Sequence, residues 1–481
     1  MIGLNFYLYS IVPKGFFPQQ DTGRLIGQIQ ADQSISFQAM REKLTRYMAI
    51  LKTDPAVDNV IGFTGGSQRN GGTLFVALKS QKERDVSADD VIARLRKPLS
   101  QVAGASLFLQ SVQDLRVGGR QGNAQYQYTL QAENLEELRI WTPRIQAALQ
   151  QEPKVADVSV DQQDKGISNS LNIDRDLASR LGVTPQLLDA SLNDLYGQRQ
   201  ISVIYNPLNQ YQVVLEASQD QLTSPISLDR TYVVTSAGKS IPISAFVTRS
   251  TSFSSLSVNH QGQFAAATLS FNLPPGVVLG DATKAIDAAM LRIGVPSTII
   301  GGFQGTAKVF QDSLSSQPLL ILSAILAIYL VLGILYESLI HPLTILSTLP
   351  SAGIGALLAL LATKMEFSLI ALIGVILLVG IVKKNAIMMI DFALVWQRDH
   401  QCSPLEAIKE AAIMRFRPIM MTTAAAMLGA IPLAIGFGEG AELRQPLGIS
   451  IIGGLLVSQL LTLFTTPVVY LYLDRLRRTA R

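Results

Sequence analysis

The chain has 481 residues, of which 48% are hydrophobic and only 16% are charged, which is too apolar and too long for an ordinary soluble domain. Its net charge of +4 is small and dispersed, so we expect no nucleic-acid partner. One cysteine, Cys402, excludes a disulfide framework and a cysteine-based metal cluster. The three histidines match no metal-ligand spacing, and no nucleotide-binding motif or catalytic triad is recognisable. The sequence therefore predicts neither an enzyme nor a metal site.

The N-terminal segment Met1–Val12 is apolar but roughly half as long as a transmembrane helix must be. It lacks the basic start and the small-residue cleavage site of a signal peptide. We expect residues 1–12 to be the end of a membrane helix whose beginning is absent.

Residues 13–317 are polar and contain short alternating runs. Strand and helix patterns succeed one another in the order β-α-β-β-α-β, which is typical of the ferredoxin-like split βαβ motif. The predicted elements of the first cycle are strand Arg24–Gln30, helix Ser36–Leu51, strands Val57–Phe63 and Thr73–Leu78, helix Ala88–Gln101 and strand Ser106–Val112. This pattern predicts a first α+β subdomain over residues 13–124.

A similar cycle begins at residue 125 and is interrupted by a β-rich insertion at about 200–248. Its predicted elements are strands Gln125–Gln131, Val155–Asp161, Ser170–Ile173 and Phe264–Phe271, and helices Leu135–Gln150, Gly280–Ile293 and one within Thr184–Tyr196. We assign 125–199 and 249–313 to a second α+β subdomain.

After residue 317 the chain becomes strongly apolar. Five segments are long enough to cross a bilayer, and they lie at about 318–338, 343–363, 367–391, 418–437 and 447–473, within 314–475. Basic residues gather between Asp391 and Arg417 and in the tail, 476–481. The positive-inside rule places the tail in the cytoplasm. Five crossings then place 13–317 on the outer side, which is the periplasm in a bacterium with two membranes.

Two lysines interrupt the third apolar segment. A charge near the centre of a membrane helix costs at least about 2.5–3.5 kcal/mol. One explanation is that Lys383 and Lys384 extend to the cytoplasmic headgroups. The other is that Lys384 faces the bundle interior and pairs with a carboxylate. Asp391 lies about 10 Å further along the axis, which is too far for a direct bond, so we expect it at the cytoplasmic end of the helix.

The fourth apolar segment carries a second polar feature. Arg415 and Thr422 are seven residues apart and therefore share a helix face, which would suit a polar track. The alternative is that the arginine is a positive-inside anchor and that the threonine bonds back to its own helix.

Motifs along the whole chain resemble those of the resistance–nodulation–division (RND) efflux pumps. They are GFFPQQDTG (15–23), LYESLIHP (335–342), IVKKNAIMMIDFA (381–393), RFRPIMMTT (415–423) and PLGISIIGGL (446–455). Further stretches are similar to the MdtB/MdtC branch, and to its MdtC members more than to its MdtB members: QADQSISFQAM, DPAVDNV, RVGGRQ and VNHQGQ.

The resemblance implies a proton-driven antiporter of the bacterial inner membrane that exports amphiphilic drugs and uses the proton-motive force without a cofactor. Such pumps form trimers, here with identical or MdtB/MdtC-like subunits, and work with a periplasmic adaptor and an outer-membrane channel. Residues 13–313 would then form the porter subdomains, and 200–248 would be a docking insertion.

The resemblance also assigns roles to single residues. Lys384, Arg415 and Thr422 fall on the proton relay of the family, and Asp391 is a weaker candidate. Phe63 and Phe75 fall near the drug pocket, although both could equally be core aromatics of their strands.

The resemblance covers only the second half of a full pump. In the family the relay lysine pairs with two aspartates on the fourth helix, and no acidic residue lies mid-span here. We therefore expect a missing N-terminal half, in cis or in trans, and this chain would be a fragment, a split-gene product or a truncated pseudogene product. The alternatives are a non-transporting membrane scaffold, or an RND-type exporter of metal or lipid.

Overall fold

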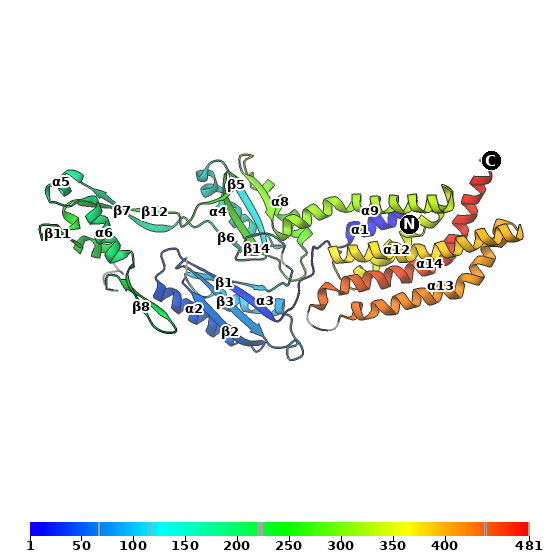
Figure 1. The fold of residues 1–481 in the computed structure, drawn as a ribbon, viewed down its shortest axis with the longest axis horizontal. Helices are drawn as coiled ribbons and strands as arrows, with labels where there is room; N and C mark the ends of the chain where they lie inside the picture. The colour runs from blue at the N-terminus through cyan, green and yellow to red at the C-terminus, as the bar shows by residue number, and fades with distance from the viewer. Residues whose placement is uncertain are drawn as a thin grey trace. The chain divides into compact units, whose positions relative to one another are not determined.

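The computed structural model describes residues 1–65, 68–115, 117–120, 122–218, 225–436, 438 and 440–479. The chain forms two compact units, Met1–Gln163 with Ser257–Arg481, and Asp164–Leu256, which we call the insertion unit. The first unit contains two larger β-sheets and a helical bundle (Figure 1).

The first sheet has four antiparallel strands in the order β2-β3-β1-β4. Its elements are β1 (Arg24–Ala31), α2 (Phe37–Lys52), β2 (Val57–Thr64), β3 (Gly71–Leu78), α3 (Ala88–Ser100) and β4 (Ala105–Ser111). Alternate strand side chains such as Leu25 and Leu74 pack against Leu44 of α2 and Leu95 of α3. All six elements predicted for the first cycle are therefore confirmed, within a few residues.

A buried ion pair stabilises the segment that leads into β1 of this sheet. The side chains of Asp21 and Arg84 are in direct contact and are 9% and 2% exposed. Asp21 also accepts hydrogen bonds from the backbone N–H groups of Ala88 (2.9 Å) and Gly23 (3.1 Å). Burial alone would raise the pKa of Asp21, but these hydrogen bonds and the Arg84 charge outweigh it and hold the pKa below its usual range.

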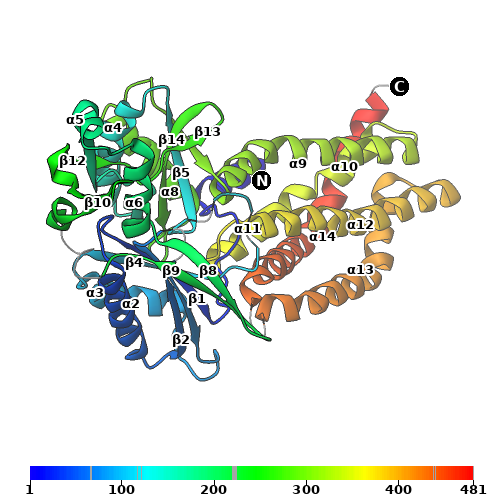
Figure 2. The same cartoon turned by 60° about the vertical axis from the view of Figure 1, so that its left-hand side comes forward.

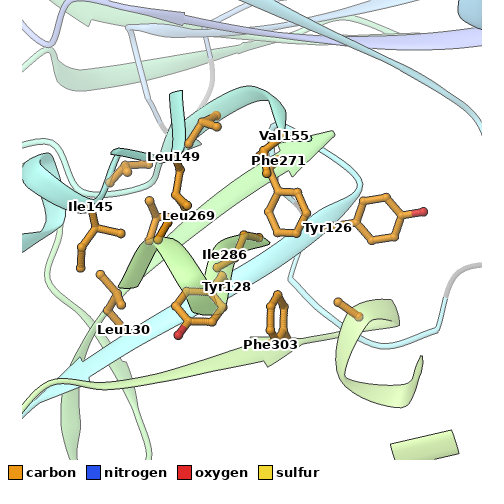
Figure 3. Packing of buried hydrophobic residues seen from close by; sticks show 14 of the residues in the cluster. Tyr126, Tyr128, Leu130, Ile145, Leu149, Val155, Leu269, Phe271, Ile286 and Phe303 are labelled. Carbon is orange, nitrogen blue, oxygen red and sulfur yellow. The ribbon is translucent and has the colours of Figure 1, made fainter. Parts of the chain in front are cut away.

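The second sheet has five strands, in which β13, β14, β5 and β15 are successive neighbours and β6 also pairs with β14. Its elements are β5 (Tyr126–Ala132), α4 (Leu135–Gln150), β6 (Ala156–Val160), β13 (Asn259–Gln261), β14 (Phe264–Asn272), α8 (Leu279–Arg292) and β15 (Ile300–Gln304). Figure 3 shows its core, where Leu130 and Leu269 of the sheet lie among helix side chains such as Ile145 and Ile286. Tyr126 lies at the margin of this cluster, with its hydroxyl pointing away from the other labelled residues.

The insertion unit is wider than the predicted insertion at 200–248. It contains β7 (Gly166–Ile173), α5 (Arg175–Arg180), α6 (Pro185–Tyr196), β8 (Arg199–Tyr205), β9 (Gln210–Leu215), η1 (Pro225–Arg230), β10 (Tyr232–Val234), β11 (Ser240–Pro242), η2 (Ile243–Ala245) and β12 (Val247–Ser254). Ala178 of α5 and Leu188 of α6 share a core with Val233 and Phe246, and β7 pairs with β12. Elements that we assigned to the second subdomain thus pack here, because local patterns predict a helix or a strand but not its partner.

Within the described residues, the helical bundle contains five helical segments that are long and apolar enough to cross a membrane, as predicted. The helices are α1 (Ile2–Ile11), α9 (Thr306–Tyr336), α10 (Ile340–Leu346), α11 (Leu349–Ala362), α12 (Leu369–His400), α13 (Pro404–Ile435) and α14 (Gln445–Thr479), with the short η3 (Ala441–Leu443); α10 and α11 together make one segment. Figures 1 and 2 show α9, α12, α13 and α14 running alongside one another.

Helix α9 belongs to two cores. We predicted that the first span begins near residue 318, but the helix begins at Thr306. Its first turns place Ala307 and Phe310 in the core of the second sheet. Near its other end, Leu332 packs in a membrane cluster with Ala386 and Met389 of α12.

The end of α12 and the start of α13 differ from the prediction. Asp391 is not at the end of its helix, because α12 continues to His400. The expected loop between Asp391 and Arg417 shrinks to Gln401–Ser403, since Ser403 and Glu406 form a capping box that starts α13. Phe437, the predicted end of the fourth span, lies outside the described residues.

Candidate functional site

Lys384 lies on an open face of α12. Its side chain is exposed, whereas the next residue, Asn385, is buried between helices. Among the residues that the structure describes, no carboxylate lies within ion-pair distance of the Lys384 ammonium. A charge on the uncovered face of an apolar helix needs headgroups or another polypeptide segment as its partner.

Behind Lys384 a buried hydrogen-bond network joins three helices. Asn385 of α12, Thr423 of α13 and Gln459 of α14 are 6%, 2% and 7% exposed. The Asn385 amide donates to the Thr423 hydroxyl (2.9 Å) and to Gln459 Oε1 (3.2 Å). Thr423 Oγ1 also lies 2.8 Å from Gln459 Oε1, and Gln459 Nε2 donates to Met420 Sδ at 3.3 Å. This network, which we call the amide triad, fixes the buried side of α12 that carries Asn385, about 100° around the helix from Lys384.

Sequence analysis missed the amide triad. Its signal was present, because Asn385 and Gln459 are single polar amides inside apolar runs, and such residues commonly bond across membrane helices. The sequence alone did not reveal that the three side chains meet.

The other predicted relay residues lie on α13. The Arg415 guanidinium lies over the Phe392 ring, 4.8 Å from its centroid. Its Nε is buried and has no hydrogen-bond partner within the described part of the chain. The Thr422 hydroxyl donates to the Ile419 carbonyl at 3.1 Å, which is the bond back to its own helix that we considered as the alternative. No hydrogen bond joins Lys384 to Arg415 or Thr422 among the described residues, so a shared relay stays a prediction.

Replacing Thr423 with valine is expected to destabilise the bundle by about 1–2 kcal/mol, because two buried amides then lose a partner. The measurement is the thermal unfolding of the purified chain in detergent. Thr422→Val is the matched control, since among the described residues that hydroxyl bonds only within its own helix, and it should cost less than about 0.5 kcal/mol. Equal losses of stability in both variants would show that the amide triad does not hold the helices together.

A polar cleft of about 580 Å³ lies between the two sheets. Asn123 donates to Gln30 Oε1 (2.7 Å), and Gln30 donates to the Val160 carbonyl (3.2 Å), so side chains bridge the cleft. Burial raises the pKa of Asp161 in its wall, although hydrogen bonds from Thr268 and other groups oppose this. The cleft can therefore bind polar groups along its walls and hold a molecule of drug size.

Phe63 and Phe75 lie on the sheet face opposite α2 and α3. They are 60% and 47% exposed, and their rings pack edge to face at 6.3 Å. The alternative that they are core aromatics is therefore wrong for both. Phe63 lines the cleft, whereas Phe75 is not part of its lining.

Known proteins resemble this chain along its whole length. A model of the AcrB/AcrD/AcrF family matches residues 1–474. Multidrug resistance protein MdtC of Pectobacterium carotovorum subsp. carotovorum is 59% identical over 480 residues, which are 100% of this chain and 47% of that protein. Multidrug resistance protein MdtC of Yersinia enterocolitica is 60% identical over 476 residues, which are 99% of this chain and 46% of that protein. The chain thus spans about half the length of the curated relatives it matches.

Among solved structures, the fold resembles an X-ray crystal structure of a heavy metal efflux pump. The TM-score is 0.87 at 21% sequence identity, and the match covers 98% of this chain and 50% of that one. At this identity the likeness establishes the fold alone.

Proposed function

The chain belongs to the AcrB/AcrD/AcrF family of transporters, the RND pumps that its motifs predicted, and from this premise we propose that it is the C-terminal half of a proton-driven multidrug efflux pump subunit. Identity of 59–60% to MdtC proteins over essentially the entire chain carries this proposal. Because the chain spans about half of those proteins, the activity is proposed for the complete pump.

The membrane face around Lys384 supports the proton-driven part of the proposal. Lys384 lies on the open side of α12, and the amide triad ties the neighbouring Asn385 to α13 and α14. In the complete pump the acidic pair of the other half would meet the ammonium group there. Protonation of those acids would weaken their attraction to Lys384 and let the helices shift. Arg415 and Thr422 would supply polar groups on the neighbouring helix, and Asp391, inside α12, is a weaker candidate.

The polar cleft between the sheets supports the drug-binding part. Its volume suits a drug-sized ligand, and the exposed ring of Phe63, which packs edge to face against that of Phe75, offers apolar contact in its lining. We propose that the two sheets are the split βαβ porter subdomains and that the insertion unit is a docking element. Passage of amphiphilic drugs would follow opening and closing of the cleft.

The proposal also covers the location of the subunit, its partners and its energy source. The subunit would lie in the inner membrane with its sheets in the periplasm and its C-terminus in the cytoplasm. It would form a homo- or heterotrimer with MdtB/MdtC-like subunits and work with a periplasmic adaptor and an outer-membrane channel. The proton-motive force would drive it without a cofactor.

A metal exporter is the second candidate, and one observation bears on it. Paired methionines on α12 and α13 would suit a soft metal. However, Met389 is buried among apolar side chains, and the Met420 sulfur already accepts a hydrogen bond from Gln459. These contacts favour a structural role for both residues, so drugs are the proposed substrates.

The proposal is tested in a bacterium that lacks its own drug pumps but retains the adaptor and the outer-membrane channel. The chain is expressed alone and as a fusion to the first half of the Yersinia enterocolitica MdtC. We expect the fusion, but not the chain alone, to lower ethidium accumulation in a way that a protonophore reverses. Export by the chain alone would refute the need for acids from the other half. A fusion that inserts in the membrane but exports nothing would favour the scaffold alternative.

A further inference from the structure

A line of polar side chains runs through the membrane bundle where α14 packs against α10 and α11. On α14 the polar residues recur at every fourth position, so they follow one another along the helix. They are Ser458, Thr462, Thr466, Tyr470 and Asp474. The facing residues, on α10, on α11 and in the connection between them, are His341, Thr344, Thr348 and Ser351. We call this set the hydroxyl seam.

All members of the hydroxyl seam are buried, and none is more than 5% exposed. Two contacts across the helices show how its two sides pair. The hydroxyls of Ser351 and Ser458 lie 3.2 Å apart, within hydrogen-bond distance. The rings of His341 and Tyr470 stack with their centroids 6.3 Å apart and their planes at 17°. These contacts make the two sides antiparallel, so the threonines of the seam lie between them.

One hydroxyl of the seam lacks a partner. Most threonines in membrane helices bond back to their own helix, as Thr348 does by donating to the Ile345 carbonyl at 2.8 Å. Thr465 likewise donates to the Leu461 carbonyl at 2.8 Å. The adjacent Thr466 is 0% exposed, and its hydroxyl has no hydrogen-bond partner among the residues that the structure describes. Buried hydroxyls are rarely left unsatisfied, so a small polar group is expected beside Thr466.

Prolines interrupt both helices along the seam. Pro350 cannot donate the hydrogen bond that the Leu346 carbonyl would accept in a continuous helix. Pro467, directly after Thr466, cannot donate to the carbonyl of Leu463. Inside a membrane such carbonyls are satisfied by neighbouring side chains or by ordered water. The hydroxyl seam therefore combines hydroxyl groups with nearby backbone acceptors, and buried water needs several polar partners of this kind.

The hydroxyl seam is closed at one end. Beyond Ser351 and Ser458, α11 and α14 pack through small residues. A Cβ atom on Gly355 would lie 2.4 Å from the carbonyl oxygen of Gly453, and a Cβ atom on Gly453 would lie 2.2 Å from that of Ala359. Helices this close leave no space for water between them, so the polar line stops at the two serines.

The other end of the seam carries ionisable groups. His341 and Asp474 are each 5% exposed, and Asp474 is followed by the exposed Arg475 near the end of α14. Between them, the Tyr470 hydroxyl donates to Gln397 Oε1 of α12 at 3.3 Å. Buried histidines and carboxylates in membrane helices are typical of proton pathways. This end of the seam therefore has groups that can exchange protons with water outside the bundle.

The closed end of the seam adjoins the amide triad. Ser458 directly precedes Gln459, and Gln459 Oε1 accepts a hydrogen bond from Asn385 at 3.2 Å. Asn385 in turn follows Lys384 in the chain. Polar groups thus extend from the end of α14 to the residue beside the candidate relay lysine.

We propose that the hydroxyl seam holds a chain of water molecules and carries protons between the amide triad and the Asp474 end of α14. Water and hydroxyl groups can pass protons along because each both donates and accepts a hydrogen bond. The inference rests on the proposed function, in which the Asp474 end faces the cytoplasm. The seam is then the route by which protons leave the region of Lys384, and it includes neither Arg415 nor Thr422.

The first experiment asks whether water occupies the seam of the full chain. Solid-state NMR of the threonine-labelled chain in lipid nanodiscs measures how fast magnetisation passes from water to each threonine. We expect faster transfer to Thr466 than to Thr465, whose hydroxyl bonds within its own helix. The variants Thr466→Val and Thr465→Val identify the two signals. Equal transfer to both threonines would overturn the proposal.

The second experiment measures proton movement by the fusion with the first half of MdtC, in liposomes that contain a pH-sensitive dye and receive ethidium. Thr466→Val should slow proton movement about tenfold, because the water chain loses a hydrogen-bond partner. Ser458→Ala should slow it in the same direction, and it decides the matter if Thr466→Val does not fold. Thr465→Val is the matched control and should keep the rate of the unmodified fusion. Unchanged rates in both seam variants would overturn the proposal.

Thermal unfolding separates the proposal from a purely structural role. If the Thr466 hydroxyl were dry, valine would remove an unsatisfied polar group, and the Tm of the chain would rise. A hydroxyl that binds water predicts no such rise, so a higher Tm for Thr466→Val would count against the seam. If the unmodified fusion moves neither ethidium nor protons, the proposed function fails. The NMR and Tm comparisons on the chain alone then still decide whether the seam holds water.

Discussion

Replacing Lys384 with alanine is expected to reduce drug export by the fused, complete pump to the level of cells without a pump. The ammonium group lies on the open face of α12, where no carboxylate of its own chain neutralises it within the described residues. Without this charge, protonation of acids on the other half would no longer change an attraction between the helices. Ethidium accumulation in the pump-deficient strain measures the effect.

Lys383→Ala is the matched control for this prediction. Successive residues of a helix point about 100° apart, so Lys383 faces a different direction and is only partly exposed. We expect this variant to retain most of the export, with both variants present in equal amounts in the membrane. Normal export by Lys384→Ala would show that Lys384 is not part of the proton relay.

Replacing Arg84 with methionine is expected to destabilise the first sheet by about 3–5 kcal/mol, because it leaves the Asp21 carboxylate buried without its ionic partner. Hydrogen exchange of the backbone amides in β1 and α3 measures this local stability. Arg24→Met is the control. Arg24 and Asp114 are 3.9 Å apart and more than half exposed, so their loss should cost less than about 1 kcal/mol. Equal exchange rates in the two variants would contradict the prediction.

The same ion pair predicts an acid-sensitive sheet. The pKa of Asp21 is lowered in the folded chain, so its stabilising contribution is present above the pKa of the unfolded state. This contribution is lost as the pH falls through the lower pKa of the folded state. Exchange in β1 and α3 should therefore accelerate in acid more strongly in the unmodified chain than in an Asp21→Asn/Arg84→Met double variant.

Local patterns predicted most elements of this fold, but not which elements share a core. The strands and helices of the first sheet follow from alternation and helical periodicity, since each buries one side. By contrast, α5 and α6 could be read as helices but not assigned to the insertion unit, because that depends on contacts with Val233 and Phe246. Likewise, the polar residues around Asp391 resemble a loop until the capping box at Ser403 shows where α13 begins.

The candidate sites also differ in how far the sequence alone reveals them. Lys384 is conspicuous in the sequence, because a charge inside an apolar run has a large energetic cost. The amide triad depends on side chains that come from three separate helices. Asn385 and Gln459 meet only when α12 and α14 pack against each other. No local pattern encodes such encounters.

Helix α9 connects the membrane bundle to the second sheet, because it packs in the cores of both. Its 31 residues form a rod about 46 Å long, with Phe310 anchored in the sheet and Leu332 anchored beside α12. Most side chains between these two residues are exposed. Few other elements of the chain therefore pack against α9 between its two ends. A shift of α12 along the rod must therefore either drag the sheet with it or bend α9, and Pro318 is where the helix is weakest. The extent of any motion around Lys384 is thus limited by how far the sheet can follow and how far α9 can bend at Pro318.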